Sequence, residues 1–184
     1  MKKFDYIRPK TFEEALAHLA QYGEKAQLIA GGTDVIVMIK QKTIAPDVLI
    51  SLQGIPGLDQ IQHNGSLSIG PMVTHRAIEK SEVIKKNFYA LADAADDLGS
   101  IQIRNVATIG GNICTAAPSA DTATPLLGLG TKVKIESGKE ERTLPVEEFF
   151  KGPGETVLKT GEMVKELLIP KPLPNTGSAY YKLQ

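Results

Sequence analysis

The sequence predicts an α+β fold built from short helices and strands. Apolar residues recur at helical spacing in Phe12–Leu19 and again in Phe88–Leu98. Short apolar or alternating runs, such as Asp47–Leu52 and Lys132–Glu136, are typical of strands. These elements do not follow the regular strand–helix alternation of a parallel α/β sheet. A chain of 184 residues with 42% hydrophobic residues is long enough for one large domain or two small ones.

The first elements are marked by capping residues and glycines. Met1–Lys10 is expected to hold a short strand that ends at a proline. Thr11 and Glu14 form a capping box for the following helix, which should stop at Gly23. The remaining elements expected in this half are a strand at Gln27–Ala30, a helix at Val35–Lys40 capped by Asp34, and a buried strand at Asp47–Leu52.

Hairpin signals and short helices follow in the second half. Asn64-Gly65 joins two apolar runs, and both residues tolerate the positive φ of a tight turn. Ser137-Gly138 joins two further runs in the same way. The elements expected here are helices at Thr74–Lys80, Phe88–Leu98 and Ala123–Leu129, and strands at Leu58–Ile61, Leu67–Ile69, Lys132–Glu136, Arg142–Leu144 and Met163–Ile169.

Composition excludes several classes of function. Lys plus Arg and Asp plus Glu both total 21, so no basic face for nucleic acid is expected. No apolar run approaches the ~20 residues of a membrane span, and the first residues lack a secretory signal, so we expect a cytoplasmic protein. Cys114 is the single cysteine, which excludes an internal disulfide or a cysteine-held iron–sulfur cluster in this chain. The three histidines are scattered, and no metal site is expected.

Two glycine pairs are the strongest candidates for ligand binding. Ala30–Asp34 places two glycines and a threonine after a strand, and Thr108–Asn112 repeats the pattern with an asparagine. Glycine permits a close backbone approach, and successive N–H groups can converge on a phosphate. Two such loops can hold a pyrophosphate between them. Taken alone, however, each pair is more often a plain turn, and neither matches the dinucleotide or P-loop motifs.

Two further residues are expected to have ordinary structural roles. Cys114 adjoins the second glycine pair, and we expect it to pack as a small buried residue behind that loop. His75 follows Thr74 at the start of a predicted helix, where a surface or capping role is expected.

Several segments together resemble the FAD-binding medium subunit of the molybdenum hydroxylases, a family that includes xanthine dehydrogenase and carbon monoxide dehydrogenase. The matching segments are Phe4–Tyr6 with Pro9, Ala30–Asp34, Ser68–Gly70, Gln102–Ile113, Ser119–Asp121 and Gly152–Gly154. The resemblance covers essentially the whole chain. It implies the two-lobed FAD-binding fold of the PCMH and vanillyl-alcohol-oxidase type, with an N-terminal lobe at residues 1–55 and a second lobe at residues 56–184.

The resemblance also implies which residues meet the cofactor. The first glycine segment and its strand would wrap the pyrophosphate, and the second would supply another pyrophosphate contact. Asp121 would lie toward the ribose, and Lys182 beside the ring system. The full implied set is Gln27, Leu28, Ile29, Ala30, Gly31, Gly32, Thr33, Asp34, Leu98, Ile103, Thr108, Gly110, Gly111, Asn112, Asp121, Met163 and Lys182. No side chain is expected to act as a catalytic nucleophile or base, and no metal ligand is expected.

The family further implies an electron-transfer role in a larger complex. A molybdopterin large subunit would oxidise the substrate, a [2Fe-2S] small subunit would relay electrons, and FAD would pass them to NAD or another acceptor. Family members continue into a C-terminal domain that is absent from this sequence. Two other interpretations are a stand-alone flavin reductase of the same fold and a cofactor-free assembly module.

Overall fold

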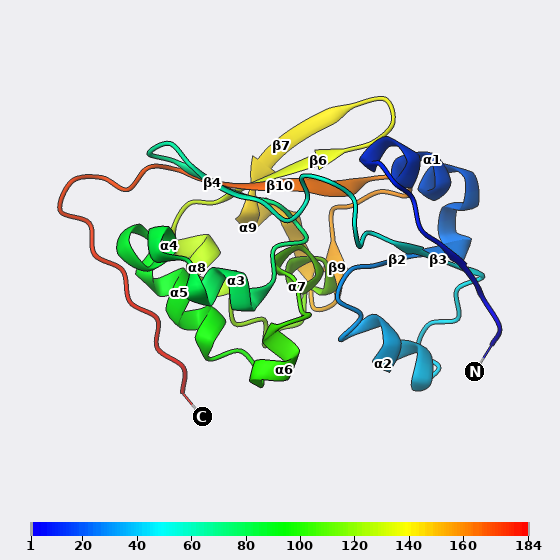
Figure 1. Cartoon of the computed structure of the whole chain (residues 1–184), viewed down its shortest axis with the longest axis horizontal. Helices are drawn as coiled ribbons and strands as arrows, with labels where there is room; N and C mark the ends of the chain where they lie inside the picture. The colour runs from blue at the N-terminus through cyan, green and yellow to red at the C-terminus, as the bar shows by residue number, and fades with distance from the viewer. Residues whose placement is uncertain (1, 184) are drawn as a thin grey trace.

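Within residues 2–183, the chain forms two main sheets of different character and one small two-stranded sheet, with the first main sheet in the N-terminal part (Figure 1). This computed structural model describes residues 2–183. The first sheet is parallel, in the order β1-β3-β2, and its strands are β1 (Asp5–Ile7), β2 (Ala26–Ile29) and β3 (Val48–Ser51). The helical elements beside it are α1 (Phe12–Tyr22), the short 3-10 helix η1 (Gly23–Lys25) and α2 (Val35–Lys40).

Local signals account for the position of α1. The Thr11 hydroxyl accepts a hydrogen bond from the Glu14 N–H at 3.1 Å, as the capping box predicts. The Glu14 carboxylate accepts from the Lys10 N–H at 2.7 Å, one residue before the cap. Gly23 ends the helix with a φ of 53°, a conformation that favours glycine. The buried face of α1 packs on β3 in a first apolar cluster that includes Phe12, Leu16, Leu19, Val48 and Ile50.

The second sheet is antiparallel and lies over most of the helices (Figure 1). Its order is β4-β5-β10-β6-β7, with β4 (Ile61–His63), β5 (Leu67–Ile69), β6 (Lys132–Glu136), β7 (Glu141–Pro145) and β10 (Met163–Ile169). The remaining elements are α3 (His75–Lys80), α4 (Glu82–Asn87), α5 (Tyr89–Asp96), α6 (Ile101–Arg104), α7 (Ile109–Thr115), α8 (Ala123–Gly128), α9 (Val146–Phe149), β8 (Phe150–Gly152) and β9 (Glu155–Thr156). A second apolar cluster joins the sheet to the helices through residues such as Leu67, Val133, Leu167, Phe88 and Leu91.

The α+β prediction is confirmed, including both hairpins. Gly65 has a φ of 96°, in keeping with its predicted turn. No helix within residues 2–183 is long and apolar enough to cross a membrane. The predicted lobe boundary at residue 55 stays a prediction, although Leu58 and Met163 both pack in the first cluster.

Three local predictions are wrong. The strand expected at Leu58–Ile61 begins only at Ile61, as β4, because Leu58 packs into the first apolar cluster. The glycines of Thr108–Asn112 were expected in a loop, but they form the first turn of α7. Asp34 was expected to cap α2 through its carboxylate, yet it makes no side-chain cap bond there and its own backbone is already helical. The Asp34 carboxylate instead accepts a 3.4 Å hydrogen bond from the Thr115 hydroxyl on α7. The last two differences arise from contacts between segments that are distant in sequence.

Candidate cofactor site

The two glycine segments predicted from the sequence lie against each other. A Cβ built on Gly31 would stand 1.8 Å from the Val106 carbonyl oxygen, so only glycine permits this contact. A Cβ built on Gly111 would approach Ala30 at 3.9 Å. The segment after β2 and the segment before α7 therefore meet backbone to backbone.

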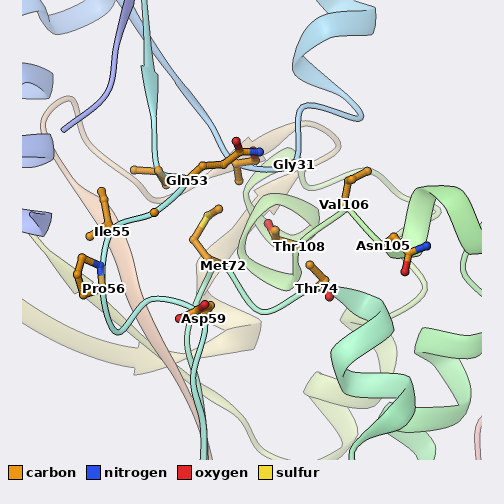
Figure 2. A pocket seen from close by; sticks show the side chains of 13 residues that line it. Gly31, Gln53, Ile55, Pro56, Asp59, Met72, Thr74, Asn105, Val106 and Thr108 are labelled. Atoms are coloured by element: carbon orange, nitrogen blue, oxygen red, sulfur yellow. The ribbon is translucent and has the colours of Figure 1, made fainter. Parts of the chain in front are cut away.

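A cavity of about 300 Å³ opens beside this junction (Figure 2). Its walls come from the end of β2, the loop after β3, the turn before α3, and the segment between α6 and α7. The lining residues are Ala30, Gly31, Leu52, Gln53, Gly54, Ile55, Pro56, Asp59, Met72, Thr74, Asn105, Val106 and Thr108. This volume is at the lower end of the range of ligand sites, so the cavity accommodates part of a dinucleotide.

The first glycine segment presents a row of free backbone donors. Within residues 2–183, no hydrogen bond is made by the N–H groups of Gly31, Gly32, Thr33 or Asp34. Gly32 has a φ of 77°, which turns the chain after β2 and favours glycine. Successive N–H groups in a turn form a concave site for an anion. This segment therefore has the donors that a pyrophosphate requires.

The second glycine segment has already used most of its donors. The Gly110 N–H donates to the Pro71 carbonyl at 3.0 Å, and the Gly111 N–H donates to the Thr108 hydroxyl at 3.1 Å. The Asn112 side-chain oxygen accepts from the Thr122 hydroxyl at 2.7 Å. The groups that remain for a ligand are the Thr108 hydroxyl proton and the Asn112 side-chain NH₂. Side chains, more than backbone, thus equip this segment to bind an anion.

Asp121 is held by the C-terminal segment. One of its carboxylate oxygens accepts from the Tyr180 hydroxyl at 2.9 Å and lies 2.8 Å from the Lys182 ammonium. Burial and the hydrogen bond to Asp121 raise the pKa of Tyr180 to about 12. The residues expected at the ribose and at the ring system are therefore in direct contact with each other.

The other residues implied by the resemblance are spread around the junction. Gln27, Leu28 and Ile29 belong to β2, next to the cavity, and only Ala30, Gly31 and Thr108 of the implied set line it. Leu98 lies in the turn between α5 and α6, and Ile103 lies within α6. Met163 does not line the cavity, and its side chain is buried in the first apolar cluster.

Two structural expectations outside this set need correction. Cys114 is exposed on α7, where we expected a small buried residue. His75 was expected at the surface or as a cap, but it is fully buried. Burial lowers the pKa of His75 to about 4, although the nearby Asp121 charge opposes this effect. His75 is therefore a neutral buried imidazole at neutral pH.

The sequence missed the cavity wall after β3. Gln53 to Pro56 was interpreted only as a boundary between lobes, yet these residues line the cavity together with Asp59. The available signal was the run Gln-Gly-Ile-Pro directly after a buried strand, which marks a loop at a strand end. Thr74 and Val106 were missed because their role depends on the pairing of the segments that precede α3 and α7, which a bridge between Thr74 and Thr108 joins.

Comparison with known proteins decides the family. Residues 2–172 match the model described as the FAD binding domain in molybdopterin dehydrogenase. The chain belongs to this family. It is 36% identical to the nicotinate dehydrogenase FAD-subunit of Eubacterium barkeri over all of this chain and 64% of that protein. It is 35% identical to the xanthine dehydrogenase FAD-binding subunit of Escherichia coli O157:H7, over 96% of this chain and 61% of that protein.

A solved structure supports the fold assignment. Carbon monoxide dehydrogenase from Hydrogenophaga pseudoflava matches with a TM-score of 0.95 and 33% identity, over 99% of this chain and 64% of the matched chain. The chain therefore spans somewhat under two thirds of the length of these relatives.

The residues at the junction fit the dinucleotide that the family binds. Four N–H groups without a partner within residues 2–183 follow β2, and a hydroxyl and an amide lie at the start of α7. The Asp59 carboxylate lines the cavity away from Gly31, and a carboxylate is unsuited to a phosphate (Figure 2).

Proposed function

We propose that this chain holds FAD at the junction of the two glycine segments and serves as the electron-transfer part of a molybdenum hydroxylase. The observation that carries the proposal is the row of four unpaired N–H groups at Gly31–Asp34, facing a segment equipped with Thr108 and Asn112. The family match and the FAD-subunit relatives support it.

In this proposal the chain binds and orients, while FAD, when bound, supplies the redox chemistry. The first segment binds the pyrophosphate through its backbone, and Thr108 and Asn112 add hydroxyl and amide donors. Asp121 accepts hydrogen bonds from ribose hydroxyls. Leu98 and Ile103 provide an apolar wall for the ring system, and Lys182 places a positive charge near it. Met163 stabilises this arrangement from the first apolar cluster.

The proposed complex follows the organisation of the family. A [2Fe-2S] small subunit delivers electrons that a molybdopterin large subunit has taken from its substrate, and the acceptor is NAD or another oxidant. We propose a cytoplasmic location, in keeping with an NAD-linked reaction.

A spectrum of the purified protein tests the cofactor assignment. We expect the protein to show flavin absorbance near ~450 nm, either as purified or after incubation with FAD. Acid should release the bound flavin as FAD. A colourless protein that takes up no added FAD would rule out the proposed function. NADH oxidation by the isolated chain would instead favour a stand-alone flavin reductase over a subunit that needs partners.

A further inference from the structure

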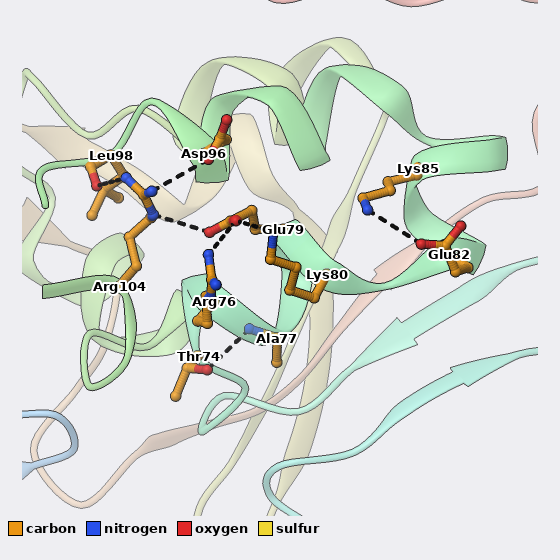
Figure 3. A network of polar contacts seen from close by, with 10 residues as sticks. All are labelled: Thr74, Arg76, Ala77, Glu79, Lys80, Glu82, Lys85, Asp96, Leu98 and Arg104. Carbon is orange, nitrogen blue, oxygen red and sulfur yellow. Dashed lines mark hydrogen bonds and ion pairs between the residues drawn. The ribbon is translucent and has the colours of Figure 1, made fainter. Parts of the chain in front are cut away.

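Arg104 is the centre of a buried polar network behind the cofactor site (Figure 3). Its guanidinium donates to three different places. Nε donates to a Glu79 carboxylate oxygen on α3 at 3.0 Å, and Nη1 donates to the Leu98 carbonyl at 3.2 Å. Nη2 donates to the Asp96 carboxylate at the end of α5 at 3.3 Å. One side chain thus joins α6 to α3, to α5 and to the turn between α5 and α6.

Three cations surround the Glu79 carboxylate at the centre of this network. Burial raises the pKa of a carboxyl group, but hydrogen bonds from Arg76 and Lys80 outweigh this effect and lower the pKa of Glu79 to about 2. Arg76 lies 2.5 Å and Lys80 2.9 Å from one carboxylate oxygen, and Arg104 bonds the other. The Arg104 guanidinium is planar and rigid, and its Glu79 partner stays ionised, so this buried pair keeps a single arrangement.

Arg104 lies next to both residues that the proposed function places against the ring system, Leu98 and Ile103. It follows Ile103 directly in the chain, and it binds the carbonyl of Leu98. It also precedes Asn105 and Val106, which form the cavity wall against Gly31. A shift of this side chain would act first on Leu98 and Ile103, whereas the N–H groups of Gly31–Asp34 lie on the segment after β2, to which Arg104 makes no bond within residues 2–183.

We propose that Arg104, anchored by Glu79, is a positioning residue that sets the apolar wall for the flavin ring. The proposal rests on the proposed function. In this proposal the Arg104 network positions the flavin ring and takes no part in pyrophosphate binding. The proposal therefore predicts that changes at Arg104 weaken binding of the flavin half of FAD more than binding of the ADP half.

The test compares FAD and ADP binding in four purified proteins: the wild type, Arg104→Lys, Asp96→Asn and the control Lys85→Gln. Lysine keeps the charge but cannot donate to all three partners. Asp96→Asn removes one exposed carboxylate and leaves the buried pair intact, so it remains informative if Arg104→Lys does not fold. Lys85→Gln breaks an exposed ion pair with Glu82 on α4, away from the network.

We expect Arg104→Lys to weaken FAD binding by about tenfold and Asp96→Asn by about threefold, because a misplaced wall loses ring contacts. ADP affinity should stay within about twofold in both, and the visible spectrum of bound flavin should shift in Arg104→Lys. Lys85→Gln should match the wild type. Equal losses of FAD and ADP binding, or unchanged FAD binding in both network variants, would overturn the positioning role. If the wild type binds ADP but not FAD, both this inference and the proposed function fail.

Discussion

At the scale of single residues, the site depends on a glycine, Gly31, at a position where no side chain fits. Gly31 has no Cβ, and this allows its backbone to contact the carbonyl of Val106 at the edge of the cavity. The need for glycine here comes first from packing within the chain. The free N–H groups that follow are a consequence of the turn this packing imposes.

Gly31→Ala should therefore damage both stability and cofactor binding. Its Cβ would lie 1.8 Å from the Val106 oxygen, so the two segments must separate, at a cost of roughly 1–3 kcal/mol or more. Gly138→Ala is the matched control, because nothing lies within 4 Å of its added Cβ. Chemical unfolding and flavin absorbance measure the two effects. A Gly31→Ala protein with wild-type stability and full FAD content would contradict the packing argument.

His75 should make the fold sensitive to mild acid. Its pKa falls from 6.5 to about 4 on burial, so the folded state resists the proton that the unfolded chain accepts. This stabilisation is present above pH 6.5 and is lost as the pH falls toward 4, in total roughly 3 kcal/mol.

Urea unfolding at several pH values between 7 and 4 measures this effect in the wild type and in His75→Leu. The variant should lose stability less steeply in this window, whereas His63→Gln, a change at an exposed residue, should follow the wild type. Identical slopes for the wild type and His75→Leu would show that groups other than His75 cause the acid sensitivity.

At the scale of elements, α7 shows how one hydroxyl serves two purposes. The Thr108 oxygen caps the helix by accepting from the Gly111 N–H, which leaves its proton free toward the cavity that it lines. Two glycines make a poor first turn by propensity alone. Backbone hydrogen bonds from the Gly110 N–H to the Pro71 carbonyl and from the Ile109 N–H to the Val73 carbonyl attach this turn to the loop between β5 and α3.

Thr108→Ala should cost about 1 kcal/mol of stability through the lost cap and should also weaken FAD binding. Thr108→Ser retains the hydroxyl and should preserve both properties. Ser81→Ala is a control for the cap alone, because Ser81 caps α4 through the Ile84 N–H, away from the cavity. Calorimetry and FAD titration separate the two effects. If Thr108→Ala and Ser81→Ala bind FAD equally well, the Thr108 hydroxyl is no cofactor contact.

The elements also show which features the sequence could predict. The capping box at Thr11, the stop at Gly23 and the hairpin at Asn64-Gly65 depend on neighbours in the chain, and all three were predicted. The helical turn that contains Gly110 and the cavity wall at Gln53–Pro56 depend on contacts between distant segments, and both were missed. The glycine pairs were recognised as a candidate site, but only the structure shows that one pair offers backbone donors and the other does not.

At the scale of the whole molecule, the cavity joins two apolar clusters: Leu52 and Ile55 of the first cluster line it, and it reaches Thr108 at the start of α7, whose Ile109 and Ile113 belong to the second. The first cluster is built on the small parallel sheet, and the second on the antiparallel sheet and its helices. The end of β2 contributes one wall and the start of α7 another. A ligand at this junction contacts both parts of the chain at once, so its binding energy couples them.

FAD should therefore protect both parts against opening, and not only the residues it touches. At a free concentration of 100 times its dissociation constant, a ligand stabilises the folded state by about 2.7 kcal/mol. Hydrogen exchange with and without FAD measures where this energy appears. We expect slower exchange in β2 and β3 and also in α6 and α7, with Gly31→Ala as a variant in which the coupling is lost. Protection confined to one of the two clusters would show that FAD binds to one part of the chain alone. The backbone contact between Gly31 and Val106 would then serve packing only, without a role in the cofactor site.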